Sequence, residues 1–285
     1  MNKKQSVALS SVFASLALTV LKLIVGLATG SVGILSEAAH SFLDLGAAIL
    51  TFFAVRVGEK EADETHHYGH QKVESVSALV ETGLLFLTSA WIIYEAIKRL
   101  TAGKAEIEVT WYAFAVIIFS IIVDYSRSRA LNKVAKVTKS QALEADALHF
   151  SSDILSSLTV LVGLVFVLLG VAKADAIAAL GVSLFVLHAG YSLGKRTVDV
   201  LVDTVPAGLP EKIRGIIHRV EGVISIKRIR VRPAGITIFI DITITVSKKL
   251  SISRAHDIAD EIEKRIKTLI PEADITIHSE PDNKV

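Results

Sequence analysis

Cysteine is absent from this chain of 285 residues, so disulfide bonds and thiolate metal ligands are excluded. Histidine, aspartate and glutamate are then the strong metal ligands that remain. Aromatic residues make up only 6% of the chain, and its formal net charge is only +2. Since the basic residues are scattered over polar connections without interleaved aromatics, we expect no nucleic-acid partner.

Only five prolines interrupt the chain, and 51% of its residues are hydrophobic, with a mean hydropathy of +0.52. This composition is too apolar for an ordinary soluble domain of this length. We therefore expect an integral membrane protein of the cell or inner membrane, in contact with the lipid bilayer. The first apolar run, residues 7–28, is too long for the core of a signal peptide and is predicted to stay as a membrane helix.

Six stretches are apolar enough to cross about 30 Å of hydrocarbon, which takes roughly 20 residues. They are residues 7–28, 32–55, 76–97, 109–123, 142–169 and 174–202. The fourth is short, so we expect it to continue into a turn that holds Asp124. The charged residues Lys22 and Glu81 are expected, like Asp124, near span ends or in turns, where snorkelling or pairing explains them.

Basic residues decide the predicted orientation in the membrane. They gather before the first span, between the second and third, and between the fourth and fifth. Because positive residues collect on the cytoplasmic side, we expect both termini to lie in the cytoplasm. Residues 1–205 are therefore predicted to form a transmembrane domain of six helices.

The periodicity of the sequence changes after Pro206. Apolar residues predict a short helix up to about Val220, a strand over residues 223–231, a turn over 232–235 and an alternating strand over 236–246. A helical stripe follows over residues 251–269, and residues 274–278 alternate again. The order α-β-β-α-β predicts that residues 206–285 form a small cytoplasmic α+β domain of the ferredoxin-like type.

Two of the predicted spans contain the same pair of ionisable side chains. The second holds His40 and Asp44, and the fifth holds His149 and Asp153. The i,i+4 spacing puts each pair on one helical face. Two such faces turned together offer two imidazole nitrogens and two carboxylate oxygens, which suits a tetrahedral divalent-metal site with zinc first in line.

A second group of ligand types lies between the second and third spans, on a predicted cytoplasmic loop. Three histidines occur within five residues, close to acidic side chains. This density of ligands predicts a second ion held by Asp63, His66 and His70, although a solvated polar loop is the alternative.

Three motifs carry a resemblance to a known family. They are GS at residues 30–31 followed by LSEAAHSFLD at 35–44, HYGHQKVE at 67–74, and AL at 142–143 followed by HFSSD at 149–153. With the six spans and the terminal domain, they cover nearly the whole chain. The sequence is similar to the cation diffusion facilitators, which are proton-coupled exporters of zinc and related ions.

The resemblance implies a homodimer in which each protomer carries a transport site at His40, Asp44, His149 and Asp153. Prokaryotic relatives often have Asp where His40 stands, so the two His-Asp pairs resemble the zinc-selective members. The family's cytoplasmic domains often bind metal between protomers, and His256, His278 and Glu280 match ligand positions there. Two other ligand positions hold Lys227 and Thr243 here. This departure makes an exposed polar dimer face an equal alternative to a metal site.

Together, these observations predict a proton-coupled antiporter that exports a divalent transition-metal ion, zinc first, by alternating access. Zinc is expected as the transported substrate and as a structural or regulatory ion. The alternatives are a membrane metal sensor that does not transport, and an intramembrane metalloenzyme in which the metal activates water. No HExxH motif or separate catalytic base accompanies the pairs, so we do not expect an enzyme.

Overall fold

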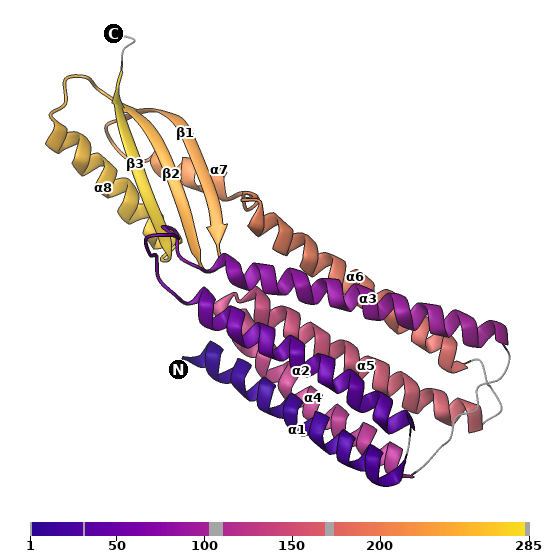
Figure 1. The fold of residues 1–285 in the computed structure, drawn as a ribbon. Helices are drawn as coiled ribbons and strands as arrows, with labels where there is room; N and C mark the ends of the chain where they lie inside the picture. Colours follow the sequence, from indigo (N-terminus) through magenta and orange to yellow (C-terminus); the bar gives the residue numbers. More distant parts are fainter. Residues whose placement is uncertain (1, 31, 103–110, 169–173, 283–285) are drawn as a thin grey trace. The chain divides into compact units, whose positions relative to one another are not determined.

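The computed structural model describes residues 2–30, 32–102, 111–168 and 174–282, in two compact units. The first unit is Met1–Val198 and the second is Asp199–Val285. Long helices that run side by side make up the first unit (Figure 1). They are α1 (Lys3–Thr29), α2 (Val32–Gly58), α3 (Lys72–Ala102), α4 (Trp111–Thr138), α5 (Gln141–Leu168) and α6 (Ala174–Leu201).

Four of these helices, α1, α2, α3 and α6, have described segments that are long and apolar enough to cross a membrane. Over their described residues, α4 and α5 do not meet the same test. Both carry several charged side chains. The helical membrane unit is confirmed, whereas the count of six spans stays a prediction.

The turn predicted to hold Asp124 is wrong, and the pairing predicted for the three charged residues is observed. Asp124 lies inside α4, which continues as a helix to Thr138, and Lys22 and Glu81 are buried within α1 and α3. Each has a polar partner on its own or a neighbouring helix: Lys22 bonds to Glu37 and Ser41, Glu81 to Thr51, and Asp124 to Arg127. Pairing, which the sequence analysis offered as one explanation, lets these side chains occur in mid-helix.

Small residues bring the helices of the first unit close together. A core cluster joins Ala8 of α1 to alanines of α2, α4 and α5, with Leu131, Leu143 and Phe150 filling the space between them. At the α1–α2 contact, a Cβ on Gly26 would come within 2.8 Å of the Leu35 side chain. Close packing through small side chains is typical of helices in membranes, where apolar burial by itself does not drive association.

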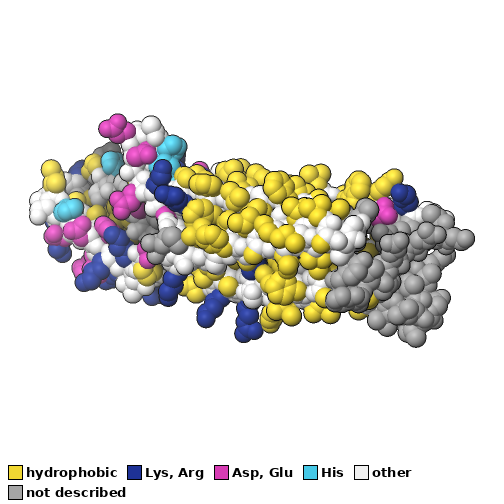
Figure 2. All heavy atoms as spheres, turned by 60° about the horizontal axis from the view of Figure 1, so that its bottom comes forward, with side chains coloured by type: hydrophobic (Ala, Val, Ile, Leu, Met, Phe, Trp, Pro, Cys, Tyr) yellow, Lys and Arg dark blue, Asp and Glu magenta, His cyan; other side chains and the backbone are white. Residues whose placement is uncertain are grey.

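The outer surface of the first unit is apolar. Large hydrophobic side chains such as Phe13, Leu27, Phe53 and Trp91 are more than half exposed. In Figure 2, hydrophobic side chains form a broad band on the visible face of the helices. A soluble protein rarely exposes such an area, and a lipid bilayer would cover it.

The second unit contains α7 (Leu209–Ile217), β1 (Val223–Ala234), β2 (Thr237–Val246), α8 (Ile252–Leu269) and β3 (Ala273–Pro281). Its sheet has the order β1-β2-β3, with β1 and β2 antiparallel and β2 and β3 parallel. The β1–β2 turn lies at Gly235–Ile236, later than predicted, because Gly235 supplies the positive φ of 60°. The predicted α-β-β-α-β order is confirmed.

The core of the second unit lies between the two helices and one face of the sheet. Fully buried isoleucines of α7, β2 and α8 meet there, including Ile213, Ile240 and Ile262. The apolar stripes of α7 and α8 and the period-two pattern of β2 supply these residues. The unit therefore has a hydrophobic core of its own.

Candidate metal sites

Helices α2 and α5 contribute the four side chains of the paired motifs. His40 and Asp44 lie one turn apart on α2, and His149 and Asp153 lie one turn apart on α5. Around Asp44, the backbone of α2 is held to α1, because the Thr19 hydroxyl donates to the Ser41 carbonyl at 2.8 Å. On α5, the Ser128 hydroxyl of α4 donates to the Ala147 carbonyl at 3.0 Å, close to His149. Neighbouring helices thus restrain both motifs.

The two pairs contact each other across the α2–α5 interface. His149 Nε2 lies 3.1 Å from Asp44 Oδ1 and 3.6 Å from Asp153 Oδ2. His40 Nε2 lies 3.8 Å from Asp44 Oδ1 and 3.7 Å from Asp153 Oδ1. Each imidazole therefore faces both carboxylates, and each carboxylate faces both imidazoles.

These separations suit a small tetrahedral ion. A tetrahedron with metal–ligand bonds of about 2.1 Å has edges of about 3.4 Å. The contacts of the two imidazoles with Asp44 Oδ1, at 3.1 and 3.8 Å, scatter around that length. His40, Asp44 and Asp153 offer ligand atoms that all lie within 4.8 Å of one another, whereas His149 lies outside that group and contacts Asp153 through its other oxygen, Oδ2. The His149 and Asp44 side chains are buried, whereas 42% of the His40 side chain is exposed. Solvent therefore reaches this group of side chains at His40.

Buried charges that the sequence analysis did not single out lie on the helices around this group. Arg127 of α4 donates to Ser11 at 3.0 Å, pairs with Asp124 at 3.1 Å, and lies 3.5 Å above the ring of Phe150. Asp146 of α5 is fully buried and accepts from the Ser11 hydroxyl at 3.2 Å. Asp146 precedes His149 by three residues, a spacing that puts both side chains on one face of α5. This spacing is the sequence signal that could have identified Asp146.

The loop between α2 and α3 brings Asp63, His66 and His70 together. Asp63 Oδ2 lies 3.3 Å from His70 Nε2, and Asp63 Oδ1 lies 3.6 Å from His66 Nδ1. The rings of His66 and His70 are stacked obliquely, with centroids 4.4 Å apart. The three side chains thus meet at one point of the loop.

Hydrogen bonds from the loop itself hold Asp63 in place. Its Oδ1 accepts from the Thr65 hydroxyl at 2.8 Å and from the backbone N–H groups of His66 and Thr65. The Thr65 hydroxyl and these N–H groups hold the pKa of Asp63 well below its ordinary value. His70 Nδ1 lies 3.3 Å from the Glu61 carbonyl, which favours a proton on Nδ1 and leaves Nε2 free to ligate.

The three candidate residues of the second unit do not come together within one protomer. His278 and Glu280 are near each other on β3, with 3.7 Å between His278 Nε2 and Glu280 Oε1. His256 lies on α8 beside Asp260 instead. Among the described residues, neither histidine nor Glu280 belongs to a cluster of three or more metal-ligand types. Lys227 of β1 pairs with Glu280, and this pairing lowers the pKa of the Glu280 carboxyl.

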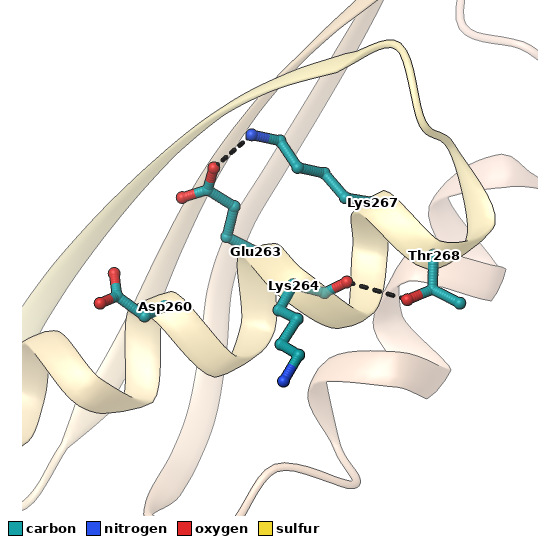
Figure 3. Close-up of a pocket in the computed structure, with 5 residues that line it drawn as sticks. All are labelled: Asp260, Glu263, Lys264, Lys267 and Thr268. Atoms are coloured by element: carbon teal, nitrogen blue, oxygen red, sulfur yellow. Dashed lines mark hydrogen bonds and ion pairs between the residues drawn. The ribbon is translucent and has the colours of Figure 1, made fainter.

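A solvent-open depression on α8 is lined by Asp260, Glu263, Lys264, Lys267 and Thr268 (Figure 3). Lys267 Nζ donates to Glu263 at 2.6 Å, and the Thr268 hydroxyl donates to the Lys264 carbonyl at 3.0 Å. The hydrogen bond to Glu263 raises the pKa of Lys267. These are ordinary i,i+4 contacts of an exposed helix, and they form no ligand site.

Two family descriptions match this chain. The description "Cation efflux transmembrane domain" matches residues 8–202, and "Cation efflux protein, cytoplasmic domain" matches residues 206–282. A cation-efflux transmembrane domain followed by a cation-efflux cytoplasmic domain defines a membrane transporter of metal cations. The chain belongs to the cation efflux family, also called the cation diffusion facilitators.

Cation-efflux pumps of bacteria are similar to this chain over most of its length. The cation-efflux pump FieF of Salmonella typhi is 32% identical over 271 residues, which cover 93% of this chain and 88% of the relative. FieF of Yersinia enterocolitica is 29% identical over 280 residues, covering 97% and 92%. The nickel form of a MamM CTD variant is 21% identical and covers 26% of this chain and 95% of its own, with a TM-score of 0.25. The family descriptions and the efflux-pump relatives show that this chain is a transporter and not an enzyme.

Proposed function

We propose that this protein is a proton-coupled antiporter that exports a divalent transition-metal ion, zinc first, from the cytoplasm. The observation that carries the proposal is the set of four imidazole–carboxylate contacts of 3.1 to 3.8 Å across α2 and α5. Two carboxylates balance the charge of a dication, and two imidazoles favour a borderline ion such as zinc over harder ions. His40, Asp44, His149 and Asp153 form the proposed transport site.

Proton coupling follows from the chemistry of imidazole. A histidine nitrogen binds metal only when it carries no proton, so metal binding and protonation at His40 and His149 exclude each other. In the proposed cycle, metal enters from the cytoplasm, the α2–α5 pair becomes accessible from the other side, and protons replace the ion there. The clusters of basic residues support an orientation with both termini in the cytoplasm.

Uptake into inside-out vesicles tests this function. With purified protein in vesicles and an imposed pH gradient, we expect zinc to accumulate against the proton flow, and cadmium, iron and manganese to be taken up less. A sensor would bind zinc without moving it, and a metalloenzyme would turn over a substrate without a change in internal zinc. Zinc uptake that ignores the pH gradient would contradict proton coupling while leaving metal efflux intact.

The loop group of Asp63, His66 and His70 is proposed to hold a second ion. We expect Asp63→Ala to lower the zinc bound per chain by one, because Asp63 is the only one of the three ligands that carries a negative charge. His67→Ala is the matched control, since His67 lies in the same loop outside the cluster. Calorimetry of the full chain measures the count. An unchanged count in Asp63→Ala would remove the loop site.

The second unit, proposed to be a cytoplasmic dimerisation domain, is expected to dimerise without metal. Lys227 supplies a positive charge beside Glu280, where a metal would otherwise balance the carboxylate. We expect residues 206–285 to form a folded dimer in chelator, as measured by analytical ultracentrifugation. We expect Lys227→Ala to bind zinc more tightly than the unaltered domain. Tight binding of two zinc ions per protomer by the unaltered domain would show that Lys227 does not replace a metal.

A further inference from the structure

Two buried carboxyl groups outside the proposed transport site have no assigned role. Glu81 of α3 is 1% exposed and Asp146 of α5 is fully buried. Oε1 of Glu81 accepts from the hydroxyls of Thr51 and Ser77, and Oδ2 of Asp146 accepts from the Ser11 hydroxyl. Each carboxyl group is therefore bonded through one oxygen to hydroxyl groups.

The other oxygen of each group is unpartnered. Among the described residues, no hydrogen-bond donor reaches Glu81 Oε2 or Asp146 Oδ1, although both atoms are shielded from solvent. A buried carboxylate oxygen without a donor is costly, and a proton bound to it removes that cost. Neither residue belongs to a cluster of three or more metal-ligand types in the described chain, so a proton fits better than a metal.

The charges that face the two groups come from several helices. Glu81 interacts electrostatically with Asp146 and with His149 of α5. Asp146 interacts with Arg127 of α4, with His149, and with Asp44 of α2. Arg127 already pairs with Asp124 on its own helix.

Neutral contacts complete the surroundings of the pair. The Ser11 hydroxyl of α1 contacts Asp146, and the Thr51 hydroxyl of α2 contacts Glu81. Helix α6 packs on α3 where Gly194 lies against Thr82. The guanidinium of Arg127 thus faces both Asp124 and Asp146 in a region of low dielectric constant. Two neighbouring carboxylates there repel each other unless one holds a proton.

We propose that Glu81 and Asp146 share a proton that is released when metal binds between α2 and α5 and is regained when the metal leaves. This inference rests on the proposed transport site. A dication beside Asp44 attracts negative charge on Asp146, so it favours loss of the shared proton. The O–H bond of one carboxyl group breaks, the proton passes to water, and the pair changes from one negative charge to two. The pair would then carry part of the proton counterflow of the transporter.

The experiment counts protons released as zinc binds to full-length purified protein in weak buffer. An Asp63→Ala background removes the proposed loop ion. In that background, we expect Glu81→Gln to bind zinc but to release up to about one proton fewer per zinc, because the amide cannot ionise. Glu95→Gln is the matched control on the same helix, where Glu95 pairs with Lys98 at 3.9 Å. Glu81→Asp, which keeps a carboxyl group, is expected to restore proton release.

A second measurement does not depend on any variant folding. In the infrared difference spectrum of the unaltered protein, zinc is expected to remove carbonyl absorption of a protonated carboxylic acid. The inference would be overturned if zinc left the carbonyl absorption unchanged. It would also be overturned if Glu81→Gln released as many protons per zinc as the Glu95→Gln control. If the background protein releases no protons with zinc, or if Asp153→Asn binds zinc unchanged, the proposed function itself is wrong.

Discussion

Asp153→Asn is expected to reduce zinc transport by at least about 100-fold while the protein remains folded. Asparagine keeps the size of the side chain but removes one of the two negative charges that balance the dication. A net charge would then be left in the membrane interior, where it is expensive. Asp44→Asn is expected to behave in the same way, because Asp44 also faces both imidazoles.

The measurement is zinc flux in vesicles, with protein amount and oligomeric state checked by size-exclusion chromatography. Glu144→Gln is the matched control, since Glu144 is a carboxylate on the same helix that pairs with Arg196 at 2.7 Å on the surface. An exposed pair contributes little, about 1 kcal/mol or less, so the control is expected to transport zinc nearly normally. Retained flux in Asp153→Asn would remove α5 from the proposed site.

Arg127→Met is expected to destabilise the protein strongly, by about 3–5 kcal/mol, because it leaves Asp124 without its cation in a buried place. The guanidinium also bonds to Ser11 and Ser15 and lies over Phe150, so several contacts between α1, α4 and α5 are lost together. The effect is measured by heating the protein in detergent and recording the fraction that stays monodisperse. We expect a much lower unfolding temperature.

Two further variants separate charge pairing from packing. Arg129→Met changes an exposed neighbour on the same helix, and little change is expected there. Asp124→Asn combined with Arg127→Met removes both members of the pair, and it is expected to recover part of the lost stability. Equal unfolding temperatures for Arg127→Met and Arg129→Met would contradict the assigned role of the buried pair.

Much of the architecture could be predicted from the sequence because it depends on local patterns. The apolar stretches predicted the long helices, and the change of period after Pro206 predicted the second unit, since hydrophobic spacing follows the repeat of each element. The i,i+4 spacing of His40 with Asp44, and of His149 with Asp153, likewise follows from helix geometry. That these four residues carry metal stays a prediction.

The environment of buried charges required the tertiary structure. Sequence reasoning placed Lys22, Glu81 and Asp124 near span ends or in turns, where snorkelling or pairing would explain them, because an unpaired charge is costly inside a membrane. The partner of Glu81 is Thr51, which lies far away in the chain. The partner of Asp124 is Arg127, which lies on the same face of the same helix. Which helices lie side by side therefore decides whether a charge is tolerated in mid-helix.

The sequence by itself determined the class of protein: its ligand types, its apolar runs and its two paired motifs define a membrane metal transporter with a small terminal domain. Only the tertiary structure decided that each imidazole faces both carboxylates, and that Glu81 and Asp146 are buried near one another with one oxygen each unpartnered. Distances between helices depend on packing of small residues such as Gly26 and Ala8. Spacing along one helix cannot fix such distances, because they arise from side chains on different segments.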